Sequence, residues 1–372
     1  MRPEAIEAML PYLDGAYANP SGSHRFARQA RKAVDEARDV VADVVGCGPN
    51  EVVFTGCGTE SDNMAITGAV AATGNVALCS AAEHHAVLEV VEANHGEVVA
   101  VDRYARIDLD ALADTITAVE RSGRRVGLVS VMAVNNEVGT ITDVAEVARV
   151  VRRLAPDALM HTDAVQAPCW LDLRKVTPHV DLLALSAHKF GGPKGVGVLV
   201  ERGGPRVQPL IIGGGQERER RSGTHNVAGI VAAATALRLT DVERVGEQHR
   251  LVTLRNRLVD GLLARLDGVH ETIPRDDPAV TKVAGSAHVC ITGVESESLL
   301  FLLDEADVCA SAASACASGA MEPSHVLAAM GVDRSISLGA LRLSLGHAST
   351  DDDVDRALVA ITDAVTRLRS HA

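Results

Sequence analysis

Residues 181–200 read DLLALSAHKFGGPKGVGVLV, two short apolar runs joined by a basic, Gly-rich turn. The run over 181–187 is almost continuously apolar, which is typical of a strand buried on both faces of a parallel sheet. His188 and Lys189 follow it directly. Ligands of open α/β sheets bind beyond the carboxyl ends of the strands. This stretch therefore predicts an α/β fold and a candidate site at Lys189.

Short apolar runs alternate with helical patterns on both sides of this stretch. Helices are predicted from Thr59, from His84 and over 143–154. The further predicted strands cover 51–55, 75–80, 97–101, 126–132, 158–163 and 195–200. Such a βαβ series predicts a mostly parallel, seven-stranded sheet flanked by helices.

Two longer helices frame this series. An amphipathic helix is predicted over 23–46, because apolar residues recur at every third or fourth position and a glycine closes the pattern. A second helical region runs over 226–266, and the pattern after it is less regular. A chain of 372 residues exceeds one usual hydrophobic core. We expect a large domain over 14–245 and a smaller α+β domain over 246–372, with residues 1–13 packing near the smaller one.

The composition is that of an ordinary globular protein, with 47% hydrophobic residues, 23% charged residues and a net charge of -13. This charge disfavours direct binding to nucleic acid or to anionic membranes. The sequence shows no secretory signal and no apolar run of ~20 residues. The seven cysteines have neither paired nor zinc-binding spacing, so no disulfide and no metal site is predicted. We expect a cytoplasmic, reducing location in which a free thiol stays reactive.

Polar groups follow five of the predicted strands, and each group alone fits a solvated loop as well as a site. Together they fit one aldehyde cofactor that carries a phosphate and a pyridine ring. A lysine after a buried strand can form a Schiff base when its amine is partly neutral, and an aspartate can hold a pyridine nitrogen protonated. The groups are Gly58 with Thr59, Glu83 with His84, Asn135 with Asn136, Asp163 with Gln166, and Ser186 with His188 and Lys189.

Two of these groups also have a purely structural reading. Thr59 fits the N-cap of a helix, with Asp62 three residues further on. His84 and His85 fit surface histidines as well as they fit one imidazole stacked on a flat cofactor ring. The residues alone leave both readings open.

At these and further motifs the chain resembles the cysteine desulfurases of the class V aminotransferase family, over essentially its whole length. The resemblance implies a pyridoxal-phosphate-dependent transferase of fold type I. Such an enzyme removes the sulfur of L-cysteine, releases L-alanine and keeps the sulfur as a persulfide. The motifs are specific when taken together and in this order: NPSGSHRFARQAR (19–31), FTGCGTESDN (54–63), EHHAVLEVV (83–91), VNNEVGT (134–140), TDAVQ (162–166), SAHKFGGPKGVG (186–197), GGGQERERRSGTHNV (213–227), SACASGAMEPSHVL (314–327) and LRLSLGH (341–347).

The resemblance implies a role in cofactor binding for each matching position. Lys189 would form the covalent link, and Asp163 would be the partner of the pyridine nitrogen. Gln166 would donate to the phenolic oxygen, and His84 would be the stacking imidazole. The phosphate would be bound by Gly58, Thr59, Ser186 and His188, and by Thr224 of the second subunit of a homodimer.

Substrate binding is implied for three further residues. Asn136 would lie beside cofactor and substrate, while Arg342, helped by Asn19, would bind the substrate carboxylate. The planar guanidinium matches a carboxylate with two parallel hydrogen bonds. Arg342 lies in the apolar alternation of 341–345, where an unpaired charge would be costly.

Cys316 is the nucleophile that the resemblance implies. A lone cysteine is usually a small buried hydrophobe, but Cys316 lies in the small, polar stretch ASAASACASGA (310–320), which is typical of a loop. The stretch from Cys316 to Arg342 is similar to the longer class of such loops, which pass the persulfide directly to an iron–sulfur scaffold or sulfur carrier protein. The resemblance implies no resident metal, and only transient iron–sulfur ligation by Cys316. Cys309 resembles no family nucleophile and is predicted to end a strand.

The chain departs from the family pattern at its start. Family members open with a short strand that reaches the substrate pocket, whereas this sequence starts at Met1 and Arg2, just past that point, and looks truncated. Ala187 stands where a glycine often precedes the His-Lys pair.

The alternatives to a cysteine desulfurase are a selenocysteine lyase, an aminotransferase, which has no use for a loop thiol, and a catalytically impaired sulfur-transfer partner. Nucleotide binding is disfavoured, because neither GxGxxG nor GxxxxGK[ST] follows a strand.

Overall fold

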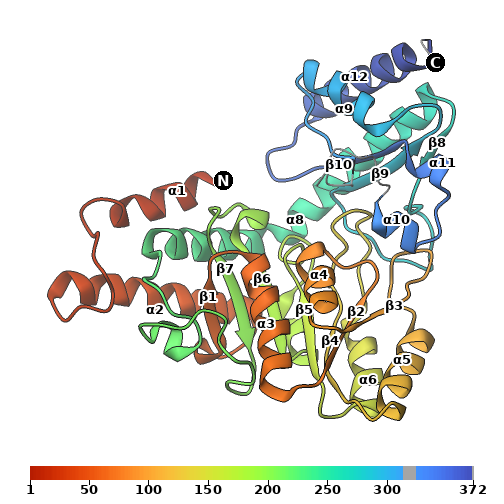
Figure 1. Ribbon diagram of the computed structural model, residues 1–372. Helices are drawn as coiled ribbons and strands as arrows, with labels where there is room; N and C mark the ends of the chain where they lie inside the picture. The colour runs from red at the N-terminus through yellow and green to blue at the C-terminus, as the bar shows by residue number, and fades with distance from the viewer. Residues whose placement is uncertain (313–323, 371–372) are drawn as a thin grey trace. The chain divides into compact units, whose positions relative to one another are not determined.

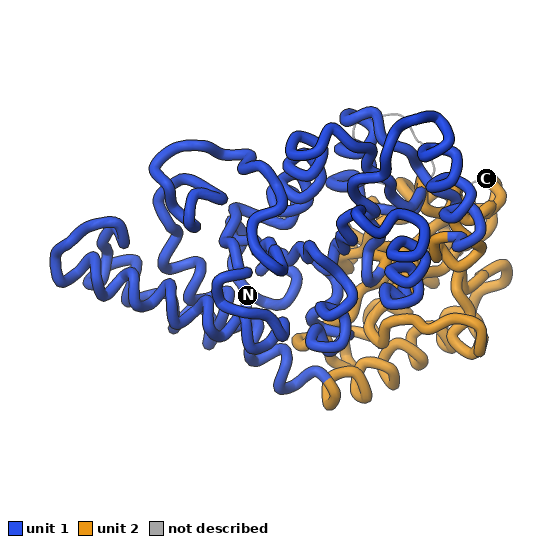
Figure 2. Tube along the Cα trace, turned by 90° about the horizontal axis from the view of Figure 1, so that it is seen from below, with its two compact units in different colours: residues 1–100, 108–134, 142–244 blue, residues 101–107, 135–141, 245–372 orange. Residues whose placement is uncertain are grey.

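A computed structural model describes residues 1–312 and 324–370 of the chain. These residues divide into two compact units (Figure 2). The first contains residues 1–100, 108–134 and 142–244, and the second contains 101–107, 135–141 and 245–372. The division of the long helix α8 (Val227–Arg265) falls between Arg244 and Val245. The two short segments that join the second unit give no signal in the sequence.

The first unit is built on a seven-stranded sheet in the order β1-β7-β6-β5-β4-β2-β3 (Figure 1). Strand β7 is antiparallel to both β1 and β6, and the other neighbours run parallel. The predicted mostly parallel sheet is confirmed, and the carboxyl ends of β1, β2, β4, β5 and β6 lie at one edge. The strands are β1 (Val52–Thr55), β2 (Val76–Ser80), β3 (Glu97–Val99), β4 (Val126–Ser130), β5 (Leu159–Asp163), β6 (Leu182–Ser186) and β7 (Gly197–Glu201).

Helices flank this sheet and bury its apolar side chains. Met64 and Ile66 of α3 pack in one cluster with Val53, Leu128 and Leu182 of three different strands. Full burial of each such side chain contributes about 1.5–3 kcal/mol. The helices of this unit besides α8 are α1 (Pro3–Met9), α2 (Arg25–Val45), α3 (Gly58–Thr73), α4 (His85–Ala93), α5 (Leu109–Arg121), α6 (Val144–Leu154) and α7 (Leu173–Val176).

The helix boundaries confirm some predictions and correct others. Helix α2 ends at Gly46, which has a φ of 79° and closes the helix in the left-handed conformation. The predicted N-cap Thr59 of α3 is wrong, because Sγ of Cys57 accepts the hydrogen bond from the Glu60 amide and Thr59 lies inside the first turn. Asp62 does not cap the helix but is buried. Helix α5 was not among the predicted elements.

The N-terminal residues belong to the first unit. Arg2 donates from its backbone N to the Gly191 carbonyl at 2.8 Å and from Nη1 to Glu243 at 2.7 Å. Residues 1–13 therefore cluster with the sheet unit, whereas the sequence placed them near the smaller domain.

The second unit has the α+β character that the sequence indicates. Its three-stranded antiparallel sheet has the order β10-β9-β8. The elements are β8 (Val269–Glu271), β9 (Ser286–Ile291), α9 (Ser296–Glu305), α10 (His325–Ala329), α11 (Arg334–Ser337), β10 (Ala340–Ser344) and α12 (Asp351–Ser370). Cys309 is exposed and lies between α9 and the Ser311 bridge, so the prediction that it ends a strand is wrong. In the described ranges, no helix is long and apolar enough to cross a bilayer.

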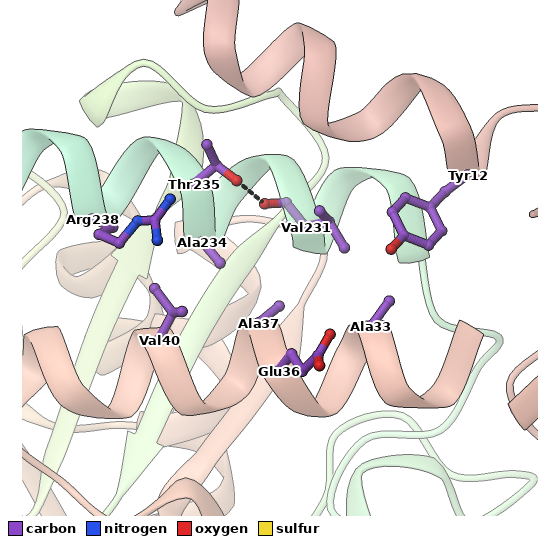
Figure 3. Close-up of a pocket in the computed structure, with 9 residues that line it drawn as sticks. All are labelled: Tyr12, Ala33, Glu36, Ala37, Val40, Val231, Ala234, Thr235 and Arg238. Atoms are coloured by element: carbon purple, nitrogen blue, oxygen red, sulfur yellow. Dashed lines mark hydrogen bonds between the residues drawn. The ribbon is translucent and has the colours of Figure 1, made fainter. Parts of the chain in front are cut away.

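A small pocket lies between α2 and α8 in the first unit (Figure 3). Its wall is made mostly of small side chains, with Glu36, Arg238 and the ring of Tyr12 at its margin. The remaining lining residues are Ala33, Ala37, Val40, Val231, Ala234 and Thr235. Of the predicted site residues that the structure describes, none lines this pocket.

Candidate active site

The turn after β6 presents Lys189. Residues 187–190 form a short 3-10 helix that Gly191 ends with a φ of 86°. A Cβ at Gly191 would lie 2.7 Å from the side chain of Arg2, so only glycine fits both the backbone and the space. Oγ of Ser186 and Nδ1 of His188 share a hydrogen bond of 2.9 Å. Ser186 is buried, whereas His188 and Lys189 are exposed at the carboxyl edge of the sheet.

Asp163 ends the neighbouring strand β5 as a buried carboxylate. Its register partner on β6 is Ala184, two residues before Ser186. Burial raises the pKa of Asp163 to about 6, although the Val165 amide, 2.8 Å from Oδ1, and the positive charge of Lys189 both favour the charged form. A cationic ring placed at this carboxylate would keep it ionised at neutral pH.

Gly58, at the start of α3, joins the ends of three strands. A Cβ there would lie 2.7 Å from Cγ2 of Val165 and 3.1 Å from Cβ of Ser186. The start of α3 is thus packed directly against the segments that carry Asp163 and Lys189. The free amides of the first turn of a helix attract anions. The exposed Thr59 lies in this same turn.

His84 and Gln166 complete the predicted residues at this edge. Nδ1 of His84 accepts a hydrogen bond of 3.0 Å from the Ala86 amide and so caps α4. Since Nδ1 is the acceptor, the proton of the neutral ring is assigned to Nε2. The side chain of His84 is exposed and that of Gln166 is half-buried. The buried Glu83 anchors the preceding turn, because its Oε1 accepts from the Met132 amide at 2.7 Å.

A buried polar cluster behind Asp163 was missed by the sequence reasoning. His161 lies two residues before Asp163 on β5, so both side chains point to the same face of the strand. Nδ1 of His161 lies 2.8 Å from Oγ of Ser130, and its Nε2 lies 3.5 Å from Oδ1 of Asp62. Burial lowers the pKa of His161 to about 3. The i,i+2 spacing of His161 and Asp163 was the available signal in the sequence. The contact of His161 with Asp62 is tertiary, so the sequence does not indicate it.

The buried carboxyl of Asp62 destabilises the folded protein by an amount that depends on pH. Burial and the charges of Asp163 and Glu83 raise its pKa, so folding takes up a proton here. Its stabilising contribution is complete below pH ~4 and is lost as the pH rises through the raised folded value. We expect Asp62→Asn to be more stable than the parent at pH 8, by ~1 kcal/mol or more, and equal to it at pH 4. Urea unfolding of the cofactor-free protein at both pH values measures this.

The exposed Asp39 in α2 supplies the matched control for this prediction. Asp39→Asn makes the same change without burial and should leave the pH dependence of stability unaltered. A loss of stability in Asp62→Asn at pH 8 would contradict the assignment of a protonated carboxyl.

Arg342 is a half-buried guanidinium in the second unit. Its Nη1 donates to the Asn136 carbonyl at 3.0 Å, and its buried Nε has no hydrogen-bond partner among the described residues. It forms no salt bridge within the described ranges of the chain. Burial lowers its pKa, and the nearby Glu137 opposes this. Arg342 and Asn136 thus lie in contact, and the guanidinium keeps donor capacity for a carboxylate.

The remaining predicted residues are not brought to these groups by any described contact. Oδ1 of Asn19 accepts from the Ser21 amide at 3.0 Å, in the turn before α2. Thr224 is exposed in the loop that precedes α8. Cys316 lies outside the described residues.

Comparison with known proteins places the chain among enzymes of sulfur metabolism. The family model for aminotransferase class-V matches residues 1–357. Cysteine desulfurase IscS of Methanosarcina thermophila is 40% identical over all of this chain and 90% of its own length. An IscS-like cysteine desulfurase of Mycobacterium tuberculosis is 42% identical over all of this chain and 95% of its own length. The solved structure of a NifS-like protein matches with a TM-score of 0.89 and 34% identity, over 99% of this chain and 96% of the other.

Proposed function

The chain belongs to the aminotransferase class-V family and is a cysteine desulfurase of fold type I, and from this we propose which of its residues bind cofactor and substrate and which carry the sulfur. The relatives at about 40% identity are named as cysteine desulfurases, so neither a selenocysteine lyase nor an impaired sulfur-transfer partner is favoured. The observation that carries the proposal is the approach of Asp163, Lys189 and the start of α3 at one edge of the sheet.

The described residues at this edge fit pyridoxal phosphate. The group, when bound, supplies an aldehyde for a covalent link to an amine and a ring that draws electrons from the Cα of the substrate. Asp163 suits the ring nitrogen, because it is a buried carboxylate that a positive charge would keep ionised. The first turn of α3, with Ser186 and His188, supplies donors for the phosphate. Gln166 would donate to the phenolic oxygen.

Lys189 and His84 are proposed as the groups that handle protons. Lys189 would hold the cofactor covalently, and its amine, once displaced by substrate, would remove the Cα proton. His84 would stack on the ring. Because its Nδ1 is engaged by the Ala86 amide, Nε2 is the atom that presents a proton. A hydrogen bond from Nε2 would favour the thiolate over the thiol of the nucleophile.

Arg342, with Asn136 and Asn19, is proposed to bind the substrate carboxylate. We expect Arg342→Ala to raise the KM for cysteine by ~10–100-fold, the effect of losing hydrogen bonds between charged groups. The cofactor spectrum should be unchanged. Initial rates over a range of cysteine concentrations measure this, and an unaltered KM would contradict the assignment.

Arg257 provides a matched control for this variant. It is an exposed arginine of the same unit that pairs with Asp351 and Asp355. Exposed ion pairs of this kind contribute little to the stability of a protein. Arg257→Ala should therefore leave both KM and the cofactor spectrum as in the parent.

Cys316 is proposed as the residue that takes the sulfur. Ser311 and Arg342 exchange backbone hydrogen bonds of 3.1 and 2.7 Å, so the described chain runs alongside the proposed carboxylate ligand just before Cys316. Five residues extend over at most ~18 Å. A thiolate on this segment would attack the substrate sulfur, which leaves the substrate carbon as alanine is formed. The persulfide would then pass to an acceptor protein such as an iron–sulfur scaffold or a sulfur carrier.

The assembly and location follow the same proposal. The protein would act as a homodimer in a reducing cytoplasm, with Thr224 of each copy binding the phosphate held by the other. Neither nucleic acid nor membrane would be a direct partner, in keeping with the net charge of -13.

The test of this function is reconstitution with pyridoxal phosphate followed by addition of cysteine and a thiol reductant. The expected result is a yellow protein that releases alanine and sulfide in equal amounts. Protein that stays colourless, or that releases sulfide without alanine, would overturn the assignment.

A further inference from the structure

A buried carboxylate, Glu217, anchors the loop that leads to Thr224. Its Oε1 and Oε2 accept from Nη2 and Nη1 of Arg38 at 2.7 and 2.8 Å, and Oε2 also accepts from the Phe54 amide at 2.9 Å. Arg38 lies on α2 and Phe54 lies on β1, so one side chain ties the loop to a helix and a strand. The guanidinium of Arg38 also stacks over the Phe54 ring, 4.7 Å from its centroid.

The backbone at Glu217 and the two residues after it has an unfavourable conformation. Glu217, Arg218 and Glu219 have φ angles of 49°, 58° and 69°, all in the left-handed region and none of them glycine. Each such residue costs about 1 kcal/mol or more. Because local conformation disfavours this run, the contacts of Glu217 with Arg38 and Phe54 must offset its cost.

The chain is held on both sides of Thr224, by Glu217 on one side and by its neighbour Gln216 on the other. Nε2 of His225 lies 2.7 Å from Oε1 of Glu217. The Gly223 amide donates to Oε1 of Gln216 at 2.8 Å. Thr224 is exposed between these two held neighbours. Its hydroxyl is therefore presented from a backbone whose shape depends on Glu217.

Glu217 keeps its charge over the whole physiological range. Burial alone would raise its pKa, but the hydrogen bonds from His225 and Arg38 and the charge of Arg38 lower it to about 2. The network is thus a fixed support and not a pH switch. An uncharged side chain of the same shape would leave Arg38 buried with its charge uncompensated.

We propose that Glu217 is a positioning residue that acts in trans: it holds the loop of residues 216–225 so that Thr224 reaches the cofactor phosphate bound by a second copy of this chain. This inference rests on the proposed function, because it takes Thr224 as a phosphate ligand across a homodimer. It adds that the residue that sets the cofactor affinity of one site lies buried in the core of the other copy.

The test is a hybrid dimer of two differently tagged copies, one with Glu217→Gln and the other with Lys189→Ala. The Glu217→Gln homodimer should bind pyridoxal phosphate ~10-fold or more weakly than the parent. In the hybrid, the copy with an intact Lys189 receives Thr224 from the copy with an intact Glu217. That site should regain the parent affinity in a spectral titration, and the hybrid about half of the parent activity. A hybrid as weak as the Glu217→Gln homodimer would overturn the inference.

Two further variants separate the possible failures. Thr224→Ala should weaken cofactor binding as Glu217→Gln does; parent affinity in Thr224→Ala would show that the assignment of Thr224 in the proposed function has failed. Glu219→Gln, an exposed carboxylate two residues away, should bind cofactor as the parent does. Should Glu217→Gln fail to fold, His225→Phe removes one hydrogen bond, leaves the Arg38 pair intact and should show the same rescue in the hybrid.

Discussion

Replacing Cys316 with alanine is expected to lower the production of alanine and sulfide by more than ~10³-fold, as removal of a catalytic nucleophile does. The variant should still bind pyridoxal phosphate and change its spectrum when cysteine is added. On the proposed assignment, these steps depend on Lys189 and Arg342, which the variant retains. Parallel assays of alanine, sulfide and the visible spectrum separate sulfur transfer from cofactor and substrate binding.

Cys309 is the matched control for this variant. It is an exposed cysteine seven positions before Cys316 in the sequence. Cys309→Ala makes the same substitution and should retain the parent rate. If Cys309→Ala lost sulfide production while Cys316→Ala stayed active, the nucleophile would be Cys309 and the assignment of Cys316 would be wrong.

Lys189→Ala is expected to lower turnover by more than ~10³-fold, because on the proposed assignment one change removes both the covalent link and the base for the Cα proton. Borohydride reduction should fix pyridoxal phosphate to the parent protein and leave the variant unlabelled. Lys189→Arg keeps a positive charge near Asp163 but has no nucleophilic amine at neutral pH. It should be inactive as well, which separates chemistry from charge.

Lys194 provides the control for the lysine variant. It is exposed in the same Gly-rich turn, five residues after Lys189. Lys194→Ala should still be labelled after reduction and should still turn over. Labelling at Lys194 in the parent would show that the wrong amine had been assigned.

The parts of the fold that the sequence predicts are those with a strong local pattern. The apolar run before Lys189 forms β6, and Gly46 ends α2 as expected, because burial on both faces and a left-handed helix end each leave a mark in the sequence. The edge of the sheet that gathers Gly58, Asp163 and Lys189 follows from parallel strands alone.

The parts that the sequence does not predict depend on tertiary contacts. The cap of α3 is wrong because Cys57 is a weak acceptor outside the usual set of capping residues, and tertiary packing places it there. The left-handed run at Glu217 contradicts local preference and exists through its contact with Arg38 on a distant helix. The meeting of Asp62 and His161 likewise joins a helix to a strand about a hundred residues apart.

The most direct measurement is a single turnover with cysteine in the absence of reductant, followed by peptide mass spectrometry. We expect one alanine per active site and the mass of one added sulfur atom on the peptide that contains Cys316, with neither product in Lys189→Ala. Alanine formed without sulfur on that peptide, or sulfur found on Cys169 beside Lys189 instead, would contradict it.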